Sequence, residues 1–177
     1  MKISRGQYKG KSLKFPKDKR IRPTQSRVRE AIMNICWENC KDTAVLDICC
    51  GTGSLGIEAL SSGAEYVTFI DSDIRYVKQN IELINPNKNK INIIKGKLEI
   101  VLPSLKDKYS LIFLDPPWKR VDLYKQALMA IAEFGILSPG GKVICEHPKD
   151  VKIESGSSLK LIKEYKYGDT MITVYTL

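Results

Sequence analysis

The stretch AVLDICCGTGSLGIEALSSG (residues 44–63) decides the fold. Its first half is a short, mainly apolar run, which is typical of a buried strand. Three glycines follow (Gly51, Gly53 and Gly56), and the second half has the composition of a helix that Gly63 closes. A strand, a glycine-rich turn and a helix in this order indicate an α/β domain with a parallel sheet.

The same alternation continues toward the C-terminus. Further strands are predicted over 66–72, 91–96, 109–115 and 141–147, and as a hairpin within 160–177. Helices are predicted over 25–39, 73–84 and 121–135, with a short one after residue 96. The sequence therefore predicts an α/β fold with a doubly wound, mostly parallel, seven-stranded sheet and an antiparallel hairpin at one edge. We expect a single domain over 1–177, with a basic hairpin and loop over 1–24 and a helix plus the core over 25–177.

Positive charge is concentrated at the N-terminus. The formal net charge is +9, and residues 1–30 hold eleven Lys or Arg and two acids, so the rest of the chain is balanced. Lys and Arg contacts to phosphates supply most sequence-independent affinity for nucleic acids, so a polyanionic partner is predicted; a solvated tail is the alternative. Two short strands are expected within 3–14, around Gly6 to Gly10. The candidate RNA-binding residues are Arg5, Lys9, Lys11, Arg20, Arg22 and Arg27.

Several classes of protein are disfavoured by the sequence. No apolar run is long enough to span a bilayer, and the first residues lack the apolar core of a signal peptide, so a cytoplasmic protein without a membrane partner is expected. The five cysteines are odd in number and two are adjacent, which argues against a disulfide framework. Cys36 and Cys40 lack a second pair of metal ligands, so buried free thiols and no metal are predicted.

Polar residues follow the first two predicted strands, at the sheet edge where ligands bind in such folds. Asp47 lies in the first strand, and Gly51, Thr52 and Gly53 form a turn where the backbone can approach a ligand. Asp71 ends the second strand, where it can accept two hydrogen bonds from a ribose diol. The glycines also match the dinucleotide fingerprint, but Asp47 would bring negative charge to a pyrophosphate. S-adenosylmethionine (SAM), cationic and free of phosphate, fits better; a dinucleotide and a tight turn without a ligand are the alternatives.

The fourth predicted strand delivers Asp115-Pro116-Pro117-Trp118 to the same edge. Two prolines make a stiff corner with free carbonyls, so the Asp115 carboxylate and the Pro116 carbonyl form two adjacent acceptors that suit an exocyclic amine. Trp118 offers a face on which an unstacked base can lie. This arrangement predicts methyl transfer to a base amine, with Asp115 or a neighbouring water taking the proton. A proline turn with a core tryptophan is the alternative.

Together these motifs make the chain resemble the RsmD family of 16S rRNA (guanine-N2)-methyltransferases, which are class I SAM-dependent enzymes with a Rossmann-like fold. The resemblance covers nearly the whole chain. Its segments are RIRPTQSRVREAIMNI (20–35), LDICCGTGSLGIEALSSGA (46–64) and LDPPW (114–118). It implies that the substrate is one guanine, at position 966 of 16S rRNA, in the small ribosomal subunit.

The resemblance also implies residue roles. Asp47, Gly51, Gly53 and Asp71 would contact SAM, and Asp115 to Trp118 would contact the guanine. It places the loop with Arg22 and Thr24 beside the cofactor. The remaining cofactor candidates are Thr52, Ser72, Lys97 and Leu98.

Lys97 departs from the pattern of the class, which often has Asp or Asn there to contact the adenine amine. Lysine has no acceptor. We therefore expect backbone and apolar contacts to adenine, beside Leu98, with Lys97 turned outward. His147 and Glu58 are interpreted as structural residues rather than site residues.

Two rival functions remain open at this point. The Asp-Pro-Pro-Trp corner alone is equally typical of adenine-N6 methylation of DNA, although the chain offers no separate sequence-reading domain, so no DNA partner is expected. The second rival is a non-catalytic RNA-binding factor in ribosome assembly, against which the intact Asp47, Asp71 and Asp115 argue. A monomer is expected.

Overall fold

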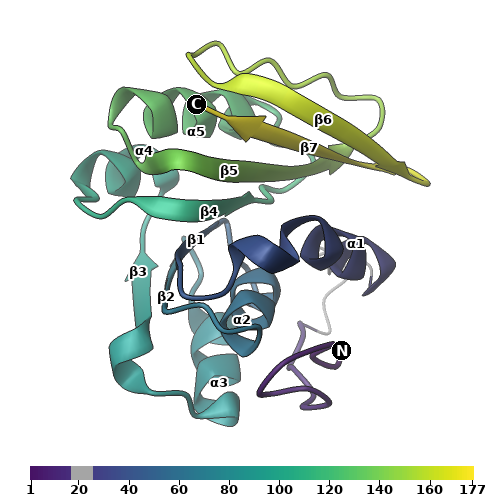
Figure 1. Cartoon of the computed structure of the whole chain (residues 1–177), viewed down its shortest axis with the longest axis vertical. Coiled ribbons are helices and arrows are strands. Elements are labelled where there is room, and N and C mark those ends of the chain that lie inside the picture. Colours follow the sequence, from purple (N-terminus) through teal and green to yellow (C-terminus); the bar gives the residue numbers. More distant parts are fainter. Residues whose placement is uncertain (17–25) are drawn as a thin grey trace.

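The computed structural model describes residues 1–16 and 26–177. Seven strands form one mixed sheet in the order β3-β2-β1-β4-β5-β7-β6 (Figure 1). The first five run parallel, β7 is antiparallel to β5, and β6 is antiparallel to β7. This confirms the predicted doubly wound, mostly parallel α/β fold with a hairpin at one edge. The strands are β1 (Ala44–Ile48), β2 (Tyr66–Asp71), β3 (Ile91–Lys95), β4 (Tyr109–Leu114), β5 (Leu137–Pro148), β6 (Lys160–Tyr167) and β7 (Thr170–Thr176).

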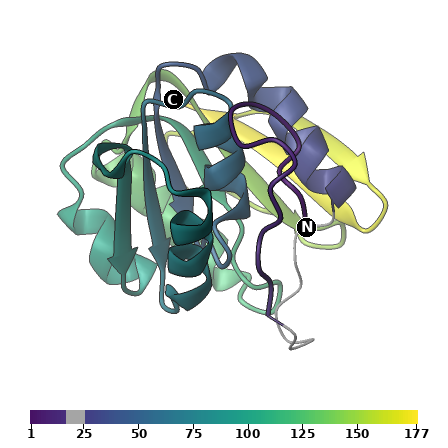
Figure 2. The same ribbon diagram turned by 90° about the horizontal axis from the view of Figure 1, so that it is seen from below.

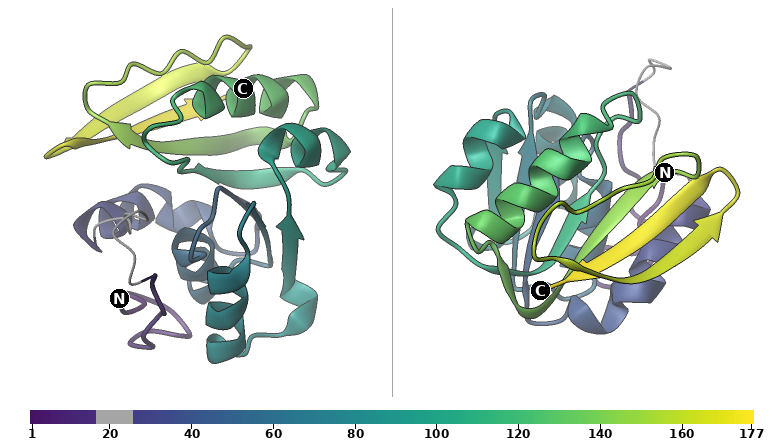
Figure 3. Two further views of the ribbon diagram at one scale, coloured as in Figure 1. Left: turned by 180° about the vertical axis from the view of Figure 1, so that it is seen from behind. Right: turned by 90° about the horizontal axis from the view of Figure 1, so that it is seen from above.

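Helices cover both faces of the sheet (Figure 3). Alternate residues of each strand point to opposite faces, so Phe113 packs with the first three helices while Ile112 and Leu114 pack with the last two. The central strands β1, β2 and β4 are therefore apolar on both sides, as their sequences indicate, whereas the edge strand β6 is exposed. The helices are α1 (Ser26–Cys36), α2 (Ser54–Ser61) and α3 (Arg75–Ile84) on one face, and α4 (Leu98–Val101) and α5 (Asp122–Glu133) on the other.

The sheet order reverses between β1 and β4, because the chain first builds outward to β3 and then returns to β4. Loops from the carboxyl ends of β1 and β4 thus diverge, and the crevice between them is the usual ligand position in open α/β sheets. The turn after β1 needs positive φ at Cys49 (60°), Gly51 (53°) and Gly53 (75°). Such angles are ordinary for glycine but uncommon for Cys49, which makes this turn a conformationally special segment.

The N-terminal segment forms the predicted hairpin only in a minimal form. One antiparallel bridge joins Lys2 to Ser12, and Ile3 N donates to Lys11 O (3.0 Å) while Leu13 N donates to Met1 O (2.7 Å). The turn between the two short strands also bonds to α2, where Gln7 N donates to Ser61 O and Tyr8 N donates to Ser61 Oγ. The segment is thus a hairpin-like loop docked against α1 and α2 (Figure 2).

A buried ion pair fixes this docking. Arg29 Nε of α1 lies 3.1 Å from Glu58 Oε1 of α2, and the two side chains have exposed fractions of 2% and 1%. Glu58 also accepts from the Ser4 amide (2.8 Å) and the Ser4 hydroxyl (2.9 Å), and Arg29 donates to the Lys2 carbonyl (3.1 Å). Glu58 is thus structural, as predicted. Arg29, one of the eleven basic residues among residues 1–30, faces the interior and not the solvent.

Other boundaries differ by a few residues. The helix predicted over 25–39 is α1 followed by a 3₁₀ turn over Trp37–Asn39, and residue 25 lies outside the described residues. The fifth strand begins at Leu137 rather than after the 139–141 turn, because Leu137 already pairs with Tyr109 and the turn is accommodated as a bulge.

Candidate active site

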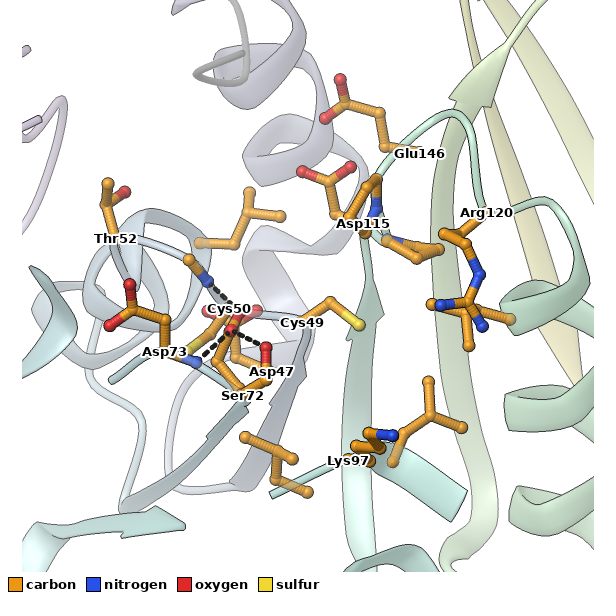
Figure 4. A pocket seen from close by; sticks show the side chains of 18 of the residues that line it. Asp47, Cys49, Cys50, Thr52, Ser72, Asp73, Lys97, Asp115, Arg120 and Glu146 are labelled. Atoms are coloured by element: carbon orange, nitrogen blue, oxygen red, sulfur yellow. Dashed lines mark hydrogen bonds between the residues drawn. The ribbon is translucent and has the colours of Figure 1, made fainter. Parts of the chain in front are cut away.

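A cavity of about 670 Å³ opens at the carboxyl ends of the five parallel strands β1 to β5. This volume is within the usual range of small-molecule sites, about 300–1,000 Å³. Figure 4 shows Ser72 and Asp73 grouped near Asp47 in one part of the cavity, and Asp115 with Glu146 in another. The cavity brings together these predicted residues: Asp47, Gly51, Thr52, Asp71, Ser72, Lys97, Leu98, Asp115, Pro116, Pro117 and Trp118.

Gly53 does not line the cavity. It precedes α2, and a Cβ built on it would lie 2.6 Å from Val77 Cγ2. Gly53 is therefore required for close packing of the turn against α3, a role that the glycine-rich pattern alone does not separate from ligand approach. Thr24, the remaining cofactor candidate, lies outside the described residues, as do Arg20 and Arg22.

Asp71, at the end of β2, is hydrogen-bonded to the glycine turn after β1. Its Oδ2 accepts from the Gly51 amide (2.8 Å) and its Oδ1 accepts from the Asp73 amide (2.9 Å). A carboxylate oxygen can accept more than one hydrogen bond, so Asp71 keeps acceptor capacity toward the cavity. Gly51, whose Cβ position faces open space, leaves the backbone beside it accessible.

Asp47 is the most perturbed carboxyl group of the site. It is buried, and burial raises its pKa to about 8, although a hydrogen bond from the Gly56 amide (2.9 Å) opposes the rise. The charges of Asp115 and Asp71 raise the pKa further. A cation in the cavity would favour the charged form of Asp47, since opposite charge lowers the pKa of a carboxyl group.

The cavity is acidic although the whole chain is basic. Among the residues that the structure describes, six acidic and three basic residues line it, whereas the net charge of the chain is +9. A phosphate group would be repelled by the carboxylates, while a cation would be attracted. The acidic lining therefore suits a cationic ligand without phosphate, as SAM is, better than a dinucleotide.

The Asp115 corner is rigid. Pro116 is buried, Trp118 is half-buried, and the Arg120 amide donates to the Pro117 carbonyl (2.7 Å), which closes the turn. The Asp115 amide reaches the Ile48 carbonyl of β1 (3.4 Å), so the corner is attached to the neighbouring strand. The carboxylate and the indole are thus presented to the same cavity as the glycine turn.

The sequence analysis missed three lining residues that bear on the chemistry. Glu146, near the end of β5, is buried with an exposed fraction of 5%. The rule that strand ends carry the site, applied to the fifth strand, would have found it. The thiols of Cys49 and Cys50 also line the cavity, and burial, with the charges of nearby carboxylates, raises the pKa of both.

The basic N-terminal residues divide into two groups. Lys9 and Arg27 are exposed, and an exposed cation is accessible to a polyanion. Arg5 donates to Asn34 Oδ1 and lies 5.4 Å from the Trp37 ring centroid. Lys11 donates to the Ile84 carbonyl at the end of α3 (3.1 Å). These two cations therefore also hold the segment in place.

The remaining candidates are structural. His147 is buried, its Nε2 lies 2.7 Å from Thr173 Oγ1, and burial lowers its pKa. Cys36 and Cys40 are buried free thiols, as predicted. Over 1–16 and 26–177, no cluster of His, Cys, Asp or Glu could hold a metal ion. Nor does any helix in that part of the chain have the length and apolarity to cross a membrane.

The comparisons with known proteins agree on one family. Residues 1–176 match the family model described as "Conserved hypothetical protein 95". "Putative rRNA methyltransferase YlbH" of Bacillus subtilis is 33% identical, and the match covers 99% of this chain and 98% of that protein. "Ribosomal RNA small subunit methyltransferase D" of Haemophilus influenzae is 28% identical over 99% of this chain and 93% of that protein.

A solved structure supports the same relationship. The structure described as "Putative methyltransferase yhhF from Escherichia coli" superposes with a TM-score of 0.85 at 25% identity. The superposition covers 99% of this chain and 96% of that chain. The likeness therefore includes the N-terminal segment as well as the sheet.

Proposed function

The chain belongs to the RsmD family of SAM-dependent methyltransferases, whose family model is described as conserved hypothetical protein 95, and from this premise we propose that it methylates rRNA of the small ribosomal subunit. The proposed acceptor is the exocyclic N2 of a guanine, at position 966 of 16S rRNA. The observation that carries the proposal is that Asp115, Trp118 and the acidic Asp47–Asp71 end share one cavity.

The Asp47 end of the cavity would hold SAM. Bound SAM supplies a methyl group on a sulfonium, which is an electrophile. Asp71 has acceptor capacity for the ribose hydroxyls beside Gly51, and Asp47 offers negative charge to the cationic part of the ligand. Thr52 and Ser72 line the same part of the cavity.

The adenine end would rely on apolar contacts. Lys97 is exposed and Leu98 is buried, and both line the cavity. This difference in exposure supports the expectation that Leu98 packs on the ring while Lys97 reaches solvent. The Gly96 amide donates to Asp71 O and the Lys97 carbonyl accepts from the first turn of α4, so the Gly96 carbonyl and the Lys97 amide would be the main-chain partners for the base.

The Asp115 corner would hold the acceptor base. The carboxylate of Asp115 and the carbonyl of Pro116 accept the two hydrogens of the base amine, which draws the nitrogen toward a tetrahedral shape and orients its lone pair. Trp118 stacks on the ring, a contact that contributes ~1–3 kcal/mol per base. Transfer then depends mainly on position, and Asp115 or an adjacent water accepts the proton that the amine loses.

The N-terminal segment would approach the rRNA. Lys9 and Arg27 are exposed cations, and Pro16, the last described residue of the segment, lines the cavity. The described part of the N-terminal segment thus reaches the cavity at Pro16. Such an arrangement separates phosphate binding outside from base and cofactor binding inside.

The test is methyl transfer from labelled SAM to small subunits that lack the modification, with free 16S rRNA and duplex DNA in parallel. The product is digested to nucleosides and separated. N2-methylguanosine from the rRNA, mapped to position 966, is the expected result. N6-methyladenine would refute the choice of base, and SAM binding without any transfer to these substrates would refute the proposed reaction.

A further inference from the structure

A second buried carboxylate stands beside Asp115. Leu114 of β4 pairs with Cys145 of β5, so Asp115 and Glu146 are the next residues on adjacent parallel strands. Both line the cavity, and Figure 4 shows their side chains in the same part of it. The proposed reaction uses Asp115 and leaves Glu146, with an exposed fraction of 5%, without a role.

The position of Glu146 is fixed by the fold. It pairs with Ile172 of β7, so its strand is held from both sides. The hydroxyl of the buried Tyr124 in α5 donates to the Glu146 carbonyl (2.6 Å). The backbone of Glu146 is thus held in place, so the point from which its carboxylate reaches the cavity is fixed, as a residue that recognises a ligand requires.

The edges of the nucleobases differ in what surrounds the amine. In guanine, the N2 amine is next to N1–H, which is a donor. The N6 amine of adenine and the N4 amine of cytosine are each next to ring nitrogens that carry a lone pair and accept. An ionised carboxylate accepts only, so a carboxylate beside the amine pairs with guanine and repels the other two.

We propose that Glu146 accepts a hydrogen bond from N1–H of the target guanine while Asp115 accepts from N2. Glu146 is then the residue that restricts the shared Asp-Pro-Pro-Trp corner to guanine. This inference rests on the proposed function, because it assigns a role within the same reaction. It requires no further reactant and leaves the methyl and proton transfers unchanged.

The test pairs one change in the base with one change in the protein. Small subunits are reconstituted with 16S rRNA that carries either guanine or 2-aminopurine at the position that the wild-type protein methylates. 2-Aminopurine keeps the N2 amine but has a lone pair at N1. Wild type, Glu146→Gln and the control Glu82→Gln, a substitution on the exposed side of α3 that removes the same charge, are compared.

We expect wild type to prefer guanine by on the order of 100-fold or more in kcat/KM. Glu146→Gln should reduce that preference by roughly tenfold or more, since a Gln amide can donate to N1 of 2-aminopurine. SAM affinity and thermal stability should change little. The preference with Glu82→Gln should equal that of wild type.

The outcomes separate this inference from the function on which it rests. If wild type methylates guanine N2 and Glu146→Gln keeps the full preference, Glu146 does not read N1 and the inference fails alone. If wild type methylates neither rRNA substrate, or methylates adenine, the proposed function fails first. A preference lowered equally by Glu146→Gln and Glu82→Gln would assign the effect to charge at a distance and would also overturn the inference.

Discussion

Substitution of Glu58 by Gln tests whether the buried ion pair with Arg29 holds the N-terminal segment on the domain. Glu58 accepts from Arg29 and twice from Ser4, at 2.8 to 3.1 Å, and both ion-pair partners are almost fully buried. Gln keeps an acceptor but leaves the guanidinium without its counter-charge. Removal of one partner of a buried pair costs roughly 3–5 kcal/mol, which corresponds to a fall of about 6–20 °C in Tm for a chain of this size.

Urea unfolding followed by circular dichroism measures this cost, and amide exchange at Ser4 reports whether the segment opens first. The control is Asp169→Asn, which removes an exposed pair with Lys149 (2.7 Å) and should leave the unfolding midpoint unchanged. If Glu58→Gln shifted stability no more than a surface pair does, less than about 1 kcal/mol, the reasoning would be refuted. Replacement of both partners by apolar residues, Arg29→Met with Glu58→Leu, should recover part of the loss.

Three further predictions concern the site. Asp115→Ala should lower methyl transfer by about 100-fold or more while SAM affinity measured by calorimetry changes little, and an equal loss of both would contradict the role of Asp115. The pKa of Asp47 is raised from 3.8 to about 8 in the folded state, so wild type loses stability as the pH rises from about 4 to 8. Asp47→Asn lacks this ionisation and should be more stable than wild type by a few kcal/mol at pH 8 and by almost nothing at pH 4. Thermal melts across that pH range measure the difference. Charge reversal at the exposed Lys9 and Arg27 should weaken binding to small subunits and reduce its salt dependence in filter-binding assays. Unchanged affinity at low salt would exclude these two residues as phosphate contacts.

The centre of the sheet was predictable because its strands are buried on both faces and therefore appear as short apolar runs, with Leu46 and Phe113 as typical members. The grouping of the candidate site residues was predictable from the same strands, since the carboxyl ends of parallel strands meet at one edge of the sheet. The N-terminal hairpin forms only in part, with one bridge between Lys2 and Ser12. Its docking on Ser61 and Glu58, about fifty residues away, could not be predicted, because local alternation does not contain that information. Gly53 was ambiguous for a related reason: a glycine needed against Val77 looks the same in sequence as a glycine needed against a ligand.

The acidic lining of the cavity also has a consequence for chemoselectivity. A thiolate is a far better nucleophile toward an alkyl sulfonium than an aryl amine is, and the thiols of Cys49 and Cys50 both line the cavity. Burial raises their pKa values, and the charges of Asp71 and Asp47 raise them further, so both thiols stay protonated at neutral pH. Burial of the two thiols, reinforced by the carboxylates that suit a cationic methyl donor, thereby disfavours alkylation of the protein by its own cofactor.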